Sequence, residues 1–400
     1  MKKFLTYLCV ICVTFALFFV LFKKTDVLPN IISNFEILVS SVKSQDVEEY
    51  NSDFSVNSLG KIKYNTYYYD KLNAEQQKIY TGIANSVKNL DETAMIKIDK
   101  DYDFAQISED AKKAMEAFFA DHPEVFYLNT EYQILTNSSL IGNSLKLYFG
   151  YSVSSKDELE QQISTIESGI KEFTSDISDL DTEYDKELKI HDSIASKVTY
   201  YSYNDITTIP EVYHTAYSAI KEKSSVCDGF TKIYQLALNQ VGISSILVTG
   251  TLESDPHAWN MVELEDGWYN VDLTSDKTIK ENNNAVVHTY FNVTNDYIKQ
   301  SHEFYDEANI PTANSEQFNY YSKESKYIKS SDNFNTKFEN ILKNNKNSVL
   351  IEFKADEKIS QVPEKIVKRL SQRDYKEYID LNTNTIQYYT VLNTYIIVKN

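Results

Sequence analysis

The chain has 400 residues, of which 42% are apolar and 13% aromatic, and this composition excludes a disordered or low-complexity protein. The length suggests two or three domains. The formal net charge is −18; beyond the first 24 residues, 36 basic residues stand against 58 acidic ones, a net charge of −22. A nucleic-acid binder needs a basic face to neutralise phosphates, so we expect no nucleic-acid partner.

The N-terminus carries a run of 19 residues without a charged side chain, at positions 4–22. Roughly 20 apolar residues span a bilayer as a helix. Lys23, Lys24 and Thr25 follow the run in place of a small-residue cleavage triplet, which favours an uncleaved anchor over a cleaved signal peptide. We therefore expect residues 1–24 to anchor the chain in the cell membrane as a single-pass protein with an extracellular body. The scarcity of arginine indicates an AT-biased genome, as in low-GC Gram-positive bacteria.

The body is expected to begin with a tether and a small α+β domain. Residues 25–60 are polar with scattered apolar positions, which is typical of a tether. Residues 61–155 are expected to form the N-terminal α+β domain, with a helix over 73–90 and a strand over 145–153. Ser108 is a plausible N-cap for a further helix, because acids and then apolar residues at helical spacing follow it.

Residues 156–310 are predicted to form the central part of the body. Apolar stripes at helical spacing predict two helices between positions 156 and 200. Two shorter helices and three strands are predicted to follow, at 213–223, 227–241, 244–249, 258–265 and 268–273. Gly242 stands where a left-handed residue often closes a helix.

The last 90 residues are expected to form a linker and a small unit. Residues 311–347 are rich in Asn, Ser and Lys, which is typical of a linker. Residues 348–400 give a strand, a helix and further strands, which predicts a small C-terminal α+β unit.

The body contains a single cysteine, Cys227, because Cys9 and Cys12 lie within the apolar run. An exported body with one cysteine forms no internal disulfide, so this thiol is either a buried small residue or a nucleophile. Cys227 is predicted to start a helix. The free N–H groups there stabilise a thiolate and can donate to an oxyanion. Taken alone, a buried thiol is the commoner role.

A base and an acid follow Cys227 in a predicted hairpin. His257 has the pKa that a base for a thiol needs, and Asp272 on the next strand is suited to orient it. Asp266-Gly267 predicts a two-residue turn, and the resulting strand pairing places the side chains of His257 and Asp272 on the same face of the hairpin. In that register, however, Asp276 lies directly opposite His257 and Asp272 is offset by roughly 13 Å, so Asp276 remains an alternative on spacing.

Two segments resemble the transglutaminase-like superfamily in its bacterial form. They are SSVCDGFTKIYQLALNQVGISSILVTG, from Ser224, and HAWNMVELEDGWYNVDLT, from His257. The resemblance implies a papain-like α+β fold, in which a helix carrying the cysteine packs on an antiparallel sheet. It further implies Cys227 as nucleophile, His257 as base and Asp272 rather than Asp276 as orienting acid. The stretch DHPEVFYL, at 121–128, resembles the domain that precedes this core in low-GC Gram-positive members.

The sequence departs from the family pattern at Ser275, where members often carry Trp after the Val-Asp-x-Thr run. The residue that completes the oxyanion hole is not identified; His214 and Tyr217 are candidates by position, although core packing is the commoner role for both. Trp259 is expected to pack the core, and Gly229 to permit close helix approach.

No pattern indicates a cofactor or a metal site. Asp255 beside His257 lacks further ligands, and His288 and His302 are isolated in sequence, which favours surface or core roles. No phosphate-binding loop, dinucleotide fingerprint or serine nucleophile elbow is present in the sequence.

Two functions are consistent with these features. The first is a cysteine peptidase or amidase, or a protein-glutamine acyltransferase, that forms a thioester with a peptide, protein or cell-wall substrate. The alternative is a non-catalytic surface binding or assembly module that keeps the fold, a role to which the abundant tyrosines would also be suited.

Overall fold

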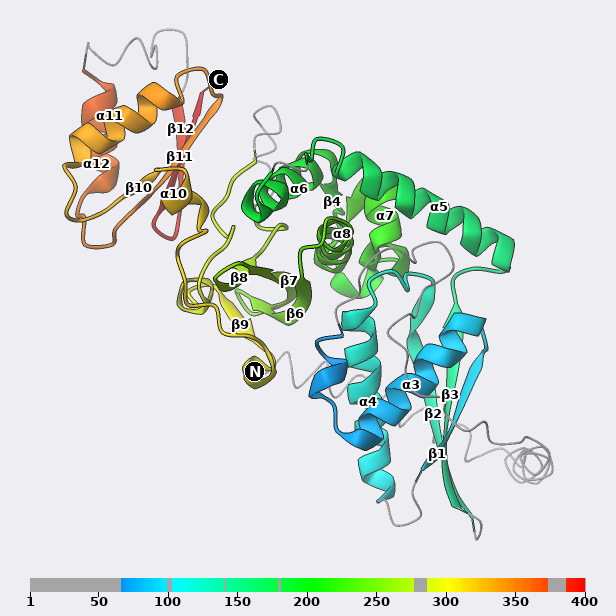
Figure 1. The fold of residues 1–400 in the computed structure, drawn as a ribbon. Helices are drawn as coiled ribbons and strands as arrows, with labels where there is room; N and C mark the ends of the chain where they lie inside the picture. The colour runs from blue at the N-terminus through cyan, green and yellow to red at the C-terminus, as the bar shows by residue number, and fades with distance from the viewer. Residues whose placement is uncertain are drawn as a thin grey trace.

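The computed structural model describes residues 66–98, 103–139, 142–178, 181–276, 286–372 and 386–399. Three units follow one another through the described part of the chain, each built on its own β-sheet (Figure 1). No helix within these ranges is both long and apolar enough to cross a bilayer. The predicted anchor at 4–22 and the whole tether at 25–60 lie outside the described residues.

The N-terminal unit packs two helices on a three-stranded antiparallel sheet of order β1-β3-β2. Its elements are η1 (Tyr69–Lys71), α3 (Ala74–Asn89), β1 (Thr93–Ile98), α4 (Phe104–Asp121), β2 (Leu128–Ser139) and β3 (Gly142–Tyr151). Asn73 caps α3 in a reciprocal capping box with Gln76. The N-cap predicted at Ser108 is wrong: α4 is capped by Asp103, which accepts from the Ala105 N–H. The helix starts a turn before the apolar periodicity that suggested Ser108.

The central unit places helices on a four-stranded antiparallel sheet of order β8-β7-β6-β9. Its helices are α5 (Lys156–Phe173), α6 (Glu183–Lys197), η2 (Ile206–Thr208), η3 (Glu211–His214), α7 (Ala216–Lys221), α8 (Cys227–Gln240), α9 (Asn295–Ile298) and η4 (Glu307–Asn309). Its strands are β4 (Thr199–Tyr200), β5 (Ser224–Ser225), β6 (Ser245–Leu252), β7 (Asp255–Leu264), β8 (Gly267–Val271) and β9 (His302–Phe304). Helix α8 lies between the sheet and helices α6 and α7 (Figure 1).

The helix predicted over 213–223 is divided in two by Thr215. This residue has extended backbone angles, and its hydroxyl accepts from the Ser218 N–H, so it caps α7. The end predicted for α8 at Gly242 agrees with the structure, since Gly242 has a φ of +83° directly after the C-cap residue.

The β7–β8 hairpin has a different register from the predicted one. Leu264 pairs with Gly267 and Asn260 with Val271, so the turn is formed by Glu265 and Asp266. The prediction required positive φ at both Asp266 and Gly267, whereas only Gly267 has it, at 139°. The register is therefore displaced by two residues, which leaves the facing of the side chains unchanged but shortens the offset between His257 and Asp272.

The C-terminal unit begins earlier than predicted. The segment 311–347, expected as a linker, contains α10 (Tyr320–Lys323), β10 (Tyr327–Ile328) and α11 (Phe334–Asn344). Strand β10 joins the sheet of β11 (Leu350–Ala355), β13 (Thr394–Lys399) and β12 (Ile386–Val391), and α12 (Val362–Leu370) completes the unit. The linker prediction was wrong because Phe334, Phe338, Ile341 and Leu342 recur at helical spacing among polar residues and are buried.

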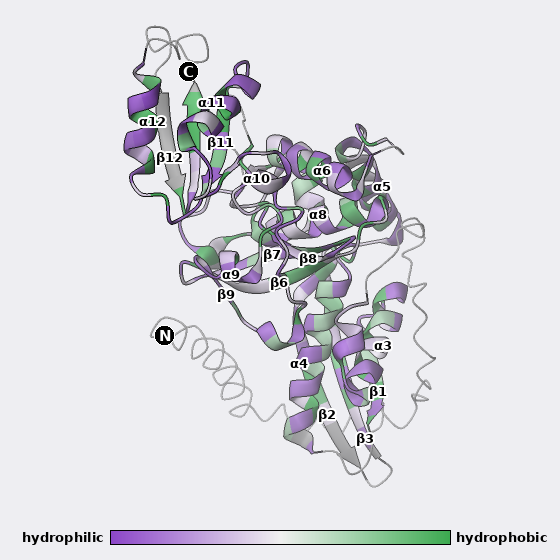
Figure 2. Cartoon of the chain, turned by 60° about the vertical axis from the view of Figure 1, so that its left-hand side comes forward, coloured by the Kyte–Doolittle hydropathy of each residue, from purple (hydrophilic) through white to green (hydrophobic). Residues whose placement is uncertain are grey.

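The described chain has two main hydrophobic cores. One runs from the N-terminal unit through the helices of the central unit, and the other belongs to the C-terminal unit. Apolar residues accordingly gather on the strands and the inner helix faces in Figure 2. The first two units are also joined by hydrogen bonds from the Tyr68 hydroxyl to the Leu247 carbonyl (2.5 Å) and from Gln235 Nε2 to the Ala120 carbonyl (3.3 Å). They therefore pack as one body.

Candidate active site

Cys227 is the first residue of α8 and is partly exposed. The first N–H groups of a helix have no partner within the helix. The N-cap here is Val226, which makes no side-chain cap. Gly229 allows this end of α8 to approach the preceding segment, because a Cβ at that position would lie 2.7 Å from the Thr215 carbonyl oxygen and 1.8 Å from Ser225 Oγ. The expected role of Gly229 is thus confirmed.

Tyr200 lies beside Cys227 through the parallel pairing of β4 with β5. The pairing puts Tyr200 next to Ser225, two residues before the cysteine. Burial raises the pKa of the Tyr200 phenol, and the charge of Cys227 raises it further. A phenol that keeps its proton is a hydrogen-bond donor at neutral pH. The sequence carries no signal for this residue, because Tyr200 is one of 31 tyrosines and lies 27 positions before Cys227.

His257, near the start of β7, connects Cys227 to Asp272. Its Nε2–H donates to Asp272 Oδ2 at 2.9 Å, and Cys227 lies close enough to raise the pKa of the imidazole. Because Nε2 is occupied by the carboxylate, Nδ1 is the nitrogen left to interact with the sulfur. The structure therefore brings the three predicted residues into one chain of contacts.

Asp272 follows β8 directly and is completely buried. Continuing the observed register places His257 opposite Thr274, so the offset of Asp272 is two residues, or roughly 7 Å, instead of the predicted four. The carboxylate also accepts from the N–H groups of Thr274 (3.0 Å) and Ser275 (3.1 Å) and from the Ser275 hydroxyl. Ser275, the departure from the family pattern, thus supplies two hydrogen bonds to the acid.

Asp276 belongs to a different group of side chains. It is buried, accepts from the Tyr290 N–H at 2.8 Å and faces His191 Nε2 at 3.4 Å. Burial raises the pKa of Asp276 to about 6, against the opposing effect of His191. The acid in contact with His257 is therefore Asp272, and the alternative based on spacing is not the arrangement found in the structure.

His302 is a second imidazole on Asp272, although it was expected in a surface or core role. It lies on β9, and its Nε2–H donates to Asp272 Oδ2 at 3.0 Å. Its Nδ1 is 2.9 Å from Ser301 Oγ, which in turn is 3.0 Å from the Tyr290 hydroxyl. The sequence holds no signal for this residue, because the pairing of β9 with β6 brings it in from 30 positions after Asp272.

Both residues considered for the oxyanion hole contact side chains other than Cys227. His214 Nδ1 is 2.9 Å from Asp228 Oδ2, so it binds the neighbour of the cysteine. Tyr217 stacks on Phe126 of the N-terminal unit, with ring centroids 5.5 Å apart. His214, Tyr217 and Phe126 line a cavity of about 220 Å³ between the first two units.

The electrostatics of the site favour charged forms of both His257 and Asp272. Burial alone lowers the pKa of His257, but the charge and hydrogen bond of Asp272, together with Cys227, raise it to about 10. Burial opposes ionisation of Asp272, whereas His257 and His302 hold the pKa of its carboxyl far below the usual range. A carboxylate that accepts several hydrogen bonds behaves in this way.

The replacement His257→Gln is expected to destabilise the protein most at pH 6 and below, and less as the pH approaches 10. The pKa of His257 rises from 6.5 to about 10 on folding. A group with a raised pKa contributes stability that is complete below its unfolded pKa and is lost as the pH rises through its folded pKa. Urea unfolding of both proteins at about pH 6, 8 and 10 measures the difference. A difference that does not change over this range would contradict the pairing.

Two groups of described residues have ligand types and spacing suited to a metal ion. One is His257, Asp272 and His302, and the other is His191, Asp192 and His288. The first group is engaged in the contacts described above. His288 and His302, expected in surface or core roles, are both buried and both contact carboxylates.

Residues 171–273 match the transglutaminase-like superfamily. Comparison with curated proteins gives no match. Among solved structures, a TGase is 14% identical over 60% of this chain and 59% of its own (TM-score 0.28). A candidate cysteine protease from Cytophaga hutchinsonii is 18% identical, and the match covers 37% of this chain and 66% of the protease chain (TM-score 0.22). A candidate protease from Parabacteroides distasonis is 13% identical over 36% of each chain (TM-score 0.19). This chain covers less than two thirds of the length of each of these three solved chains.

The matched segment includes all three predicted site residues, Cys227, His257 and Asp272. It also includes α8 and the β7–β8 hairpin, which carry them. The helix bears the cysteine and the antiparallel sheet bears the histidine, which is the arrangement that the sequence resemblance implied. This chain is an α+β protein whose residues 171–273 match the transglutaminase-like superfamily.

Proposed function

We propose that the protein is a thiol acyl-transfer enzyme in which Cys227 is the nucleophile, His257 the base and Asp272 the orienting acid. The observations that carry the proposal are the His257–Asp272 bond and the position of Cys227 close enough to His257 to raise its pKa. A thiol nucleophile requires a neighbouring base, and that base requires a group that sets its tautomer. Asp272 sets it by accepting from Nε2.

The reaction begins when the Cys227 sulfur, its proton transferred to His257, attacks an amide carbonyl. Collapse of the tetrahedral intermediate breaks the C–N bond, and the leaving amine takes the proton from His257. The resulting thioester is resolved by water in a peptidase or amidase, or by an amine in an acyltransferase. His257 removes the proton from the acceptor in both cases, and the free thiol is regenerated.

The oxyanion of the intermediate is proposed to lie at the start of α8. The Cys227 N–H is among the helix N–H groups without an intrahelical partner, and Val226 supplies no side-chain cap. The Tyr200 hydroxyl is the proposed second donor, because it keeps its proton and lies within the electrostatic reach of Cys227. Hydrogen-bond donors held at this position stabilise charge that develops in the transition state.

A peptide or protein chain is the proposed substrate class, including cell-wall peptides. The segment that follows Tyr200 exposes large apolar side chains, namely Tyr203, Ile206 and Val212. Apolar surface beside a catalytic thiol is suited to the side chains of a peptide. We further propose that the run at 4–22 anchors the enzyme in the cell membrane with its body outside.

Thiol labelling tests the proposal directly. We expect a soft electrophile such as iodoacetamide to label the body of the wild-type protein and not that of Cys227→Ala, because Cys227 is the only cysteine after position 12. Peptide mapping separates this label from any on Cys9 and Cys12. A reactive thiol requires exposure and an activating neighbour, so failure to label the folded wild-type protein would reject the nucleophile and favour the binding-module alternative.

A further inference from the structure

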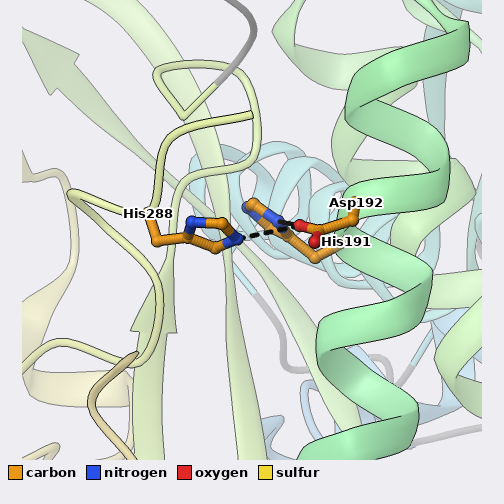
Figure 3. Close-up of side chains that lie close together, drawn as sticks. All are labelled: His191, Asp192 and His288. Carbon is orange, nitrogen blue, oxygen red and sulfur yellow. Dashed lines mark hydrogen bonds and ion pairs between the residues drawn. The ribbon is translucent and has the colours of Figure 1, made fainter. Parts of the chain in front are cut away.

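A second group of histidine and carboxylate side chains lies outside the proposed active site. His191 and Asp192 are consecutive in α6, and His288 comes from the segment that precedes α9 (Figure 3). Asp192 Oδ1 is 3.0 Å from His191 Nδ1 and 2.9 Å from His288 Nε2. One nitrogen of each imidazole and one carboxylate oxygen thus meet within 4.8 Å of one another.

The opposite nitrogen of each imidazole faces a separate buried carboxylate. His288 Nδ1 is 2.7 Å from Glu352 Oε1, and His191 Nε2 is 3.4 Å from Asp276 Oδ2. Metal-binding histidines almost always donate their other N–H to a carboxylate, a carbonyl or a water, which orients the ring and sets the tautomer. Both imidazoles are therefore held with one nitrogen available to the common centre.

Aromatic rings hold the two imidazoles in place. Tyr320 stacks on His288 with ring centroids 3.8 Å apart and planes at 10°. The Phe291 ring packs in a T-shaped arrangement against both histidines, with ring centroids 4.9 Å from that of His191 and 6.0 Å from that of His288. The His191 side chain is fully buried, whereas that of Asp192 is 45% exposed. The centre is thus rigid on the imidazole side and open to solvent on the carboxylate side.

We propose that His191, Asp192 and His288 bind one divalent transition-metal ion of the zinc type. Two imidazoles and one carboxylate form a donor set that zinc accepts, with a water from the solvent side as fourth ligand. Tetrahedral zinc with bonds of about 2.0–2.2 Å separates its ligand atoms by roughly 3.3–3.5 Å. The two contacts of Asp192, at 3.0 and 2.9 Å, need to open by only a few tenths of an ångström.

The ion would join segments that are distant in sequence. The imidazole of His288 contacts Glu352 on β11, so the site connects α6 to the C-terminal sheet. On the other side, the Asp276 N–H donates to the Asp272 carbonyl at 3.0 Å. The ion would thereby brace the turn that carries the acid of the proposed active site. A bound metal stabilises the folded form, since the unfolded chain has no assembled site.

Binding requires a proton to leave each imidazole. Burial alone lowers the pKa of His288, but Glu352 and Asp192 raise it to about 10. The pKa of His191 is also raised, by Asp192 and Asp276, against the effect of burial. Because a metal-binding imidazole must lose the proton from its ligand nitrogen, we expect metal binding to tighten as the pH rises.

The experiment uses the full-length chain in detergent, in which Cys9→Ser, Cys12→Ser and Cys227→Ala remove every thiol that could bind zinc. After chelator treatment, loading with zinc and gel filtration, we expect one zinc per chain by elemental analysis. Asp192→Asn and His288→Gln should each lose the stoichiometric ion. Glu352→Gln should weaken binding roughly 10- to 100-fold, because it orients a ligand.

His302→Gln is the matched control, because it alters the other group with ligand spacing and should keep the ion. Far-UV circular dichroism establishes that each variant is folded. Binding well below one zinc per chain at micromolar zinc would overturn the proposal. So would an Asp192→Asn variant that binds like its parent, or loss of the ion only in His302→Gln.

Discussion

We expect Asp272→Asn to reduce acyl transfer by on the order of 10²- to 10⁴-fold while leaving Cys227 in place. Asp272 accepts from His257 Nε2 at 2.9 Å, which leaves Nδ1 as the nitrogen available to the sulfur. An asparagine presents an amide that can donate as well as accept, so the imidazole is no longer held in one tautomer. The negative charge that raises the pKa of His257 is also lost.

An activated ester such as p-nitrophenyl acetate measures this loss without a known substrate, through the rate of acyl-enzyme formation. Asp276→Asn is the matched control, because Asp276 is equally buried but faces His191. We expect it to acylate at close to the wild-type rate once folding is verified. Equal rates for wild type and Asp272→Asn, or a larger loss in Asp276→Asn, would remove Asp272 from the proposed mechanism.

The second large effect is expected at Trp259, whose replacement by alanine should destabilise the protein by about 3–5 kcal/mol. Its side chain is 1% exposed and packs in the cluster of Ile246, Val248 and Met261. The indole edge also meets His302, with ring centroids 5.1 Å apart. The cavity left by the indole would therefore lie directly beside the imidazole that supports Asp272.

Urea unfolding followed by circular dichroism measures this difference, with Trp259→Phe as the comparison. Phenylalanine keeps most of the apolar volume and loses the hydrogen bond from the indole N–H to Asn270 Oδ1 (3.1 Å), so its cost should be clearly smaller. If alanine and phenylalanine cost the same, the hydrogen bond rather than packing would be the main contribution of Trp259.

Local patterns in the sequence were sufficient for much of the fold. Asn73 precedes an apolar period of 3.6 residues and caps α3, and Gly242 closes α8 with its positive φ. Side-chain caps and helical periods are short-range effects, so neighbouring residues determine them. The register of the β7–β8 hairpin was not predictable to the residue, because it depends on the φ angles at Asp266 and Gly267.

The proposed site was likewise predictable from the sequence only in part. Cys227, His257 and Asp272 could be selected from the sequence because each falls in a short family pattern, and the β-strand period of two places the histidine and the acid on one face. The choice between Asp272 and Asp276 was not decided by spacing. It depends on a register change of two residues, which brings Asp272 within roughly 7 Å of His257 along the strands.

By itself, the sequence determined the α+β class and the single thiol of the body, which follow from composition and local periodicity. The candidate set of thiol, imidazole and carboxylate came from the resemblance to a family pattern. Only the tertiary structure decided that Tyr200 lies beside the thiol, that His302 supports Asp272 and that His288 meets His191 and Asp192. The physical reason is that these contacts join segments far apart in the chain. Strand pairing and core packing bring such segments together, and no local pattern encodes which distant partner they meet.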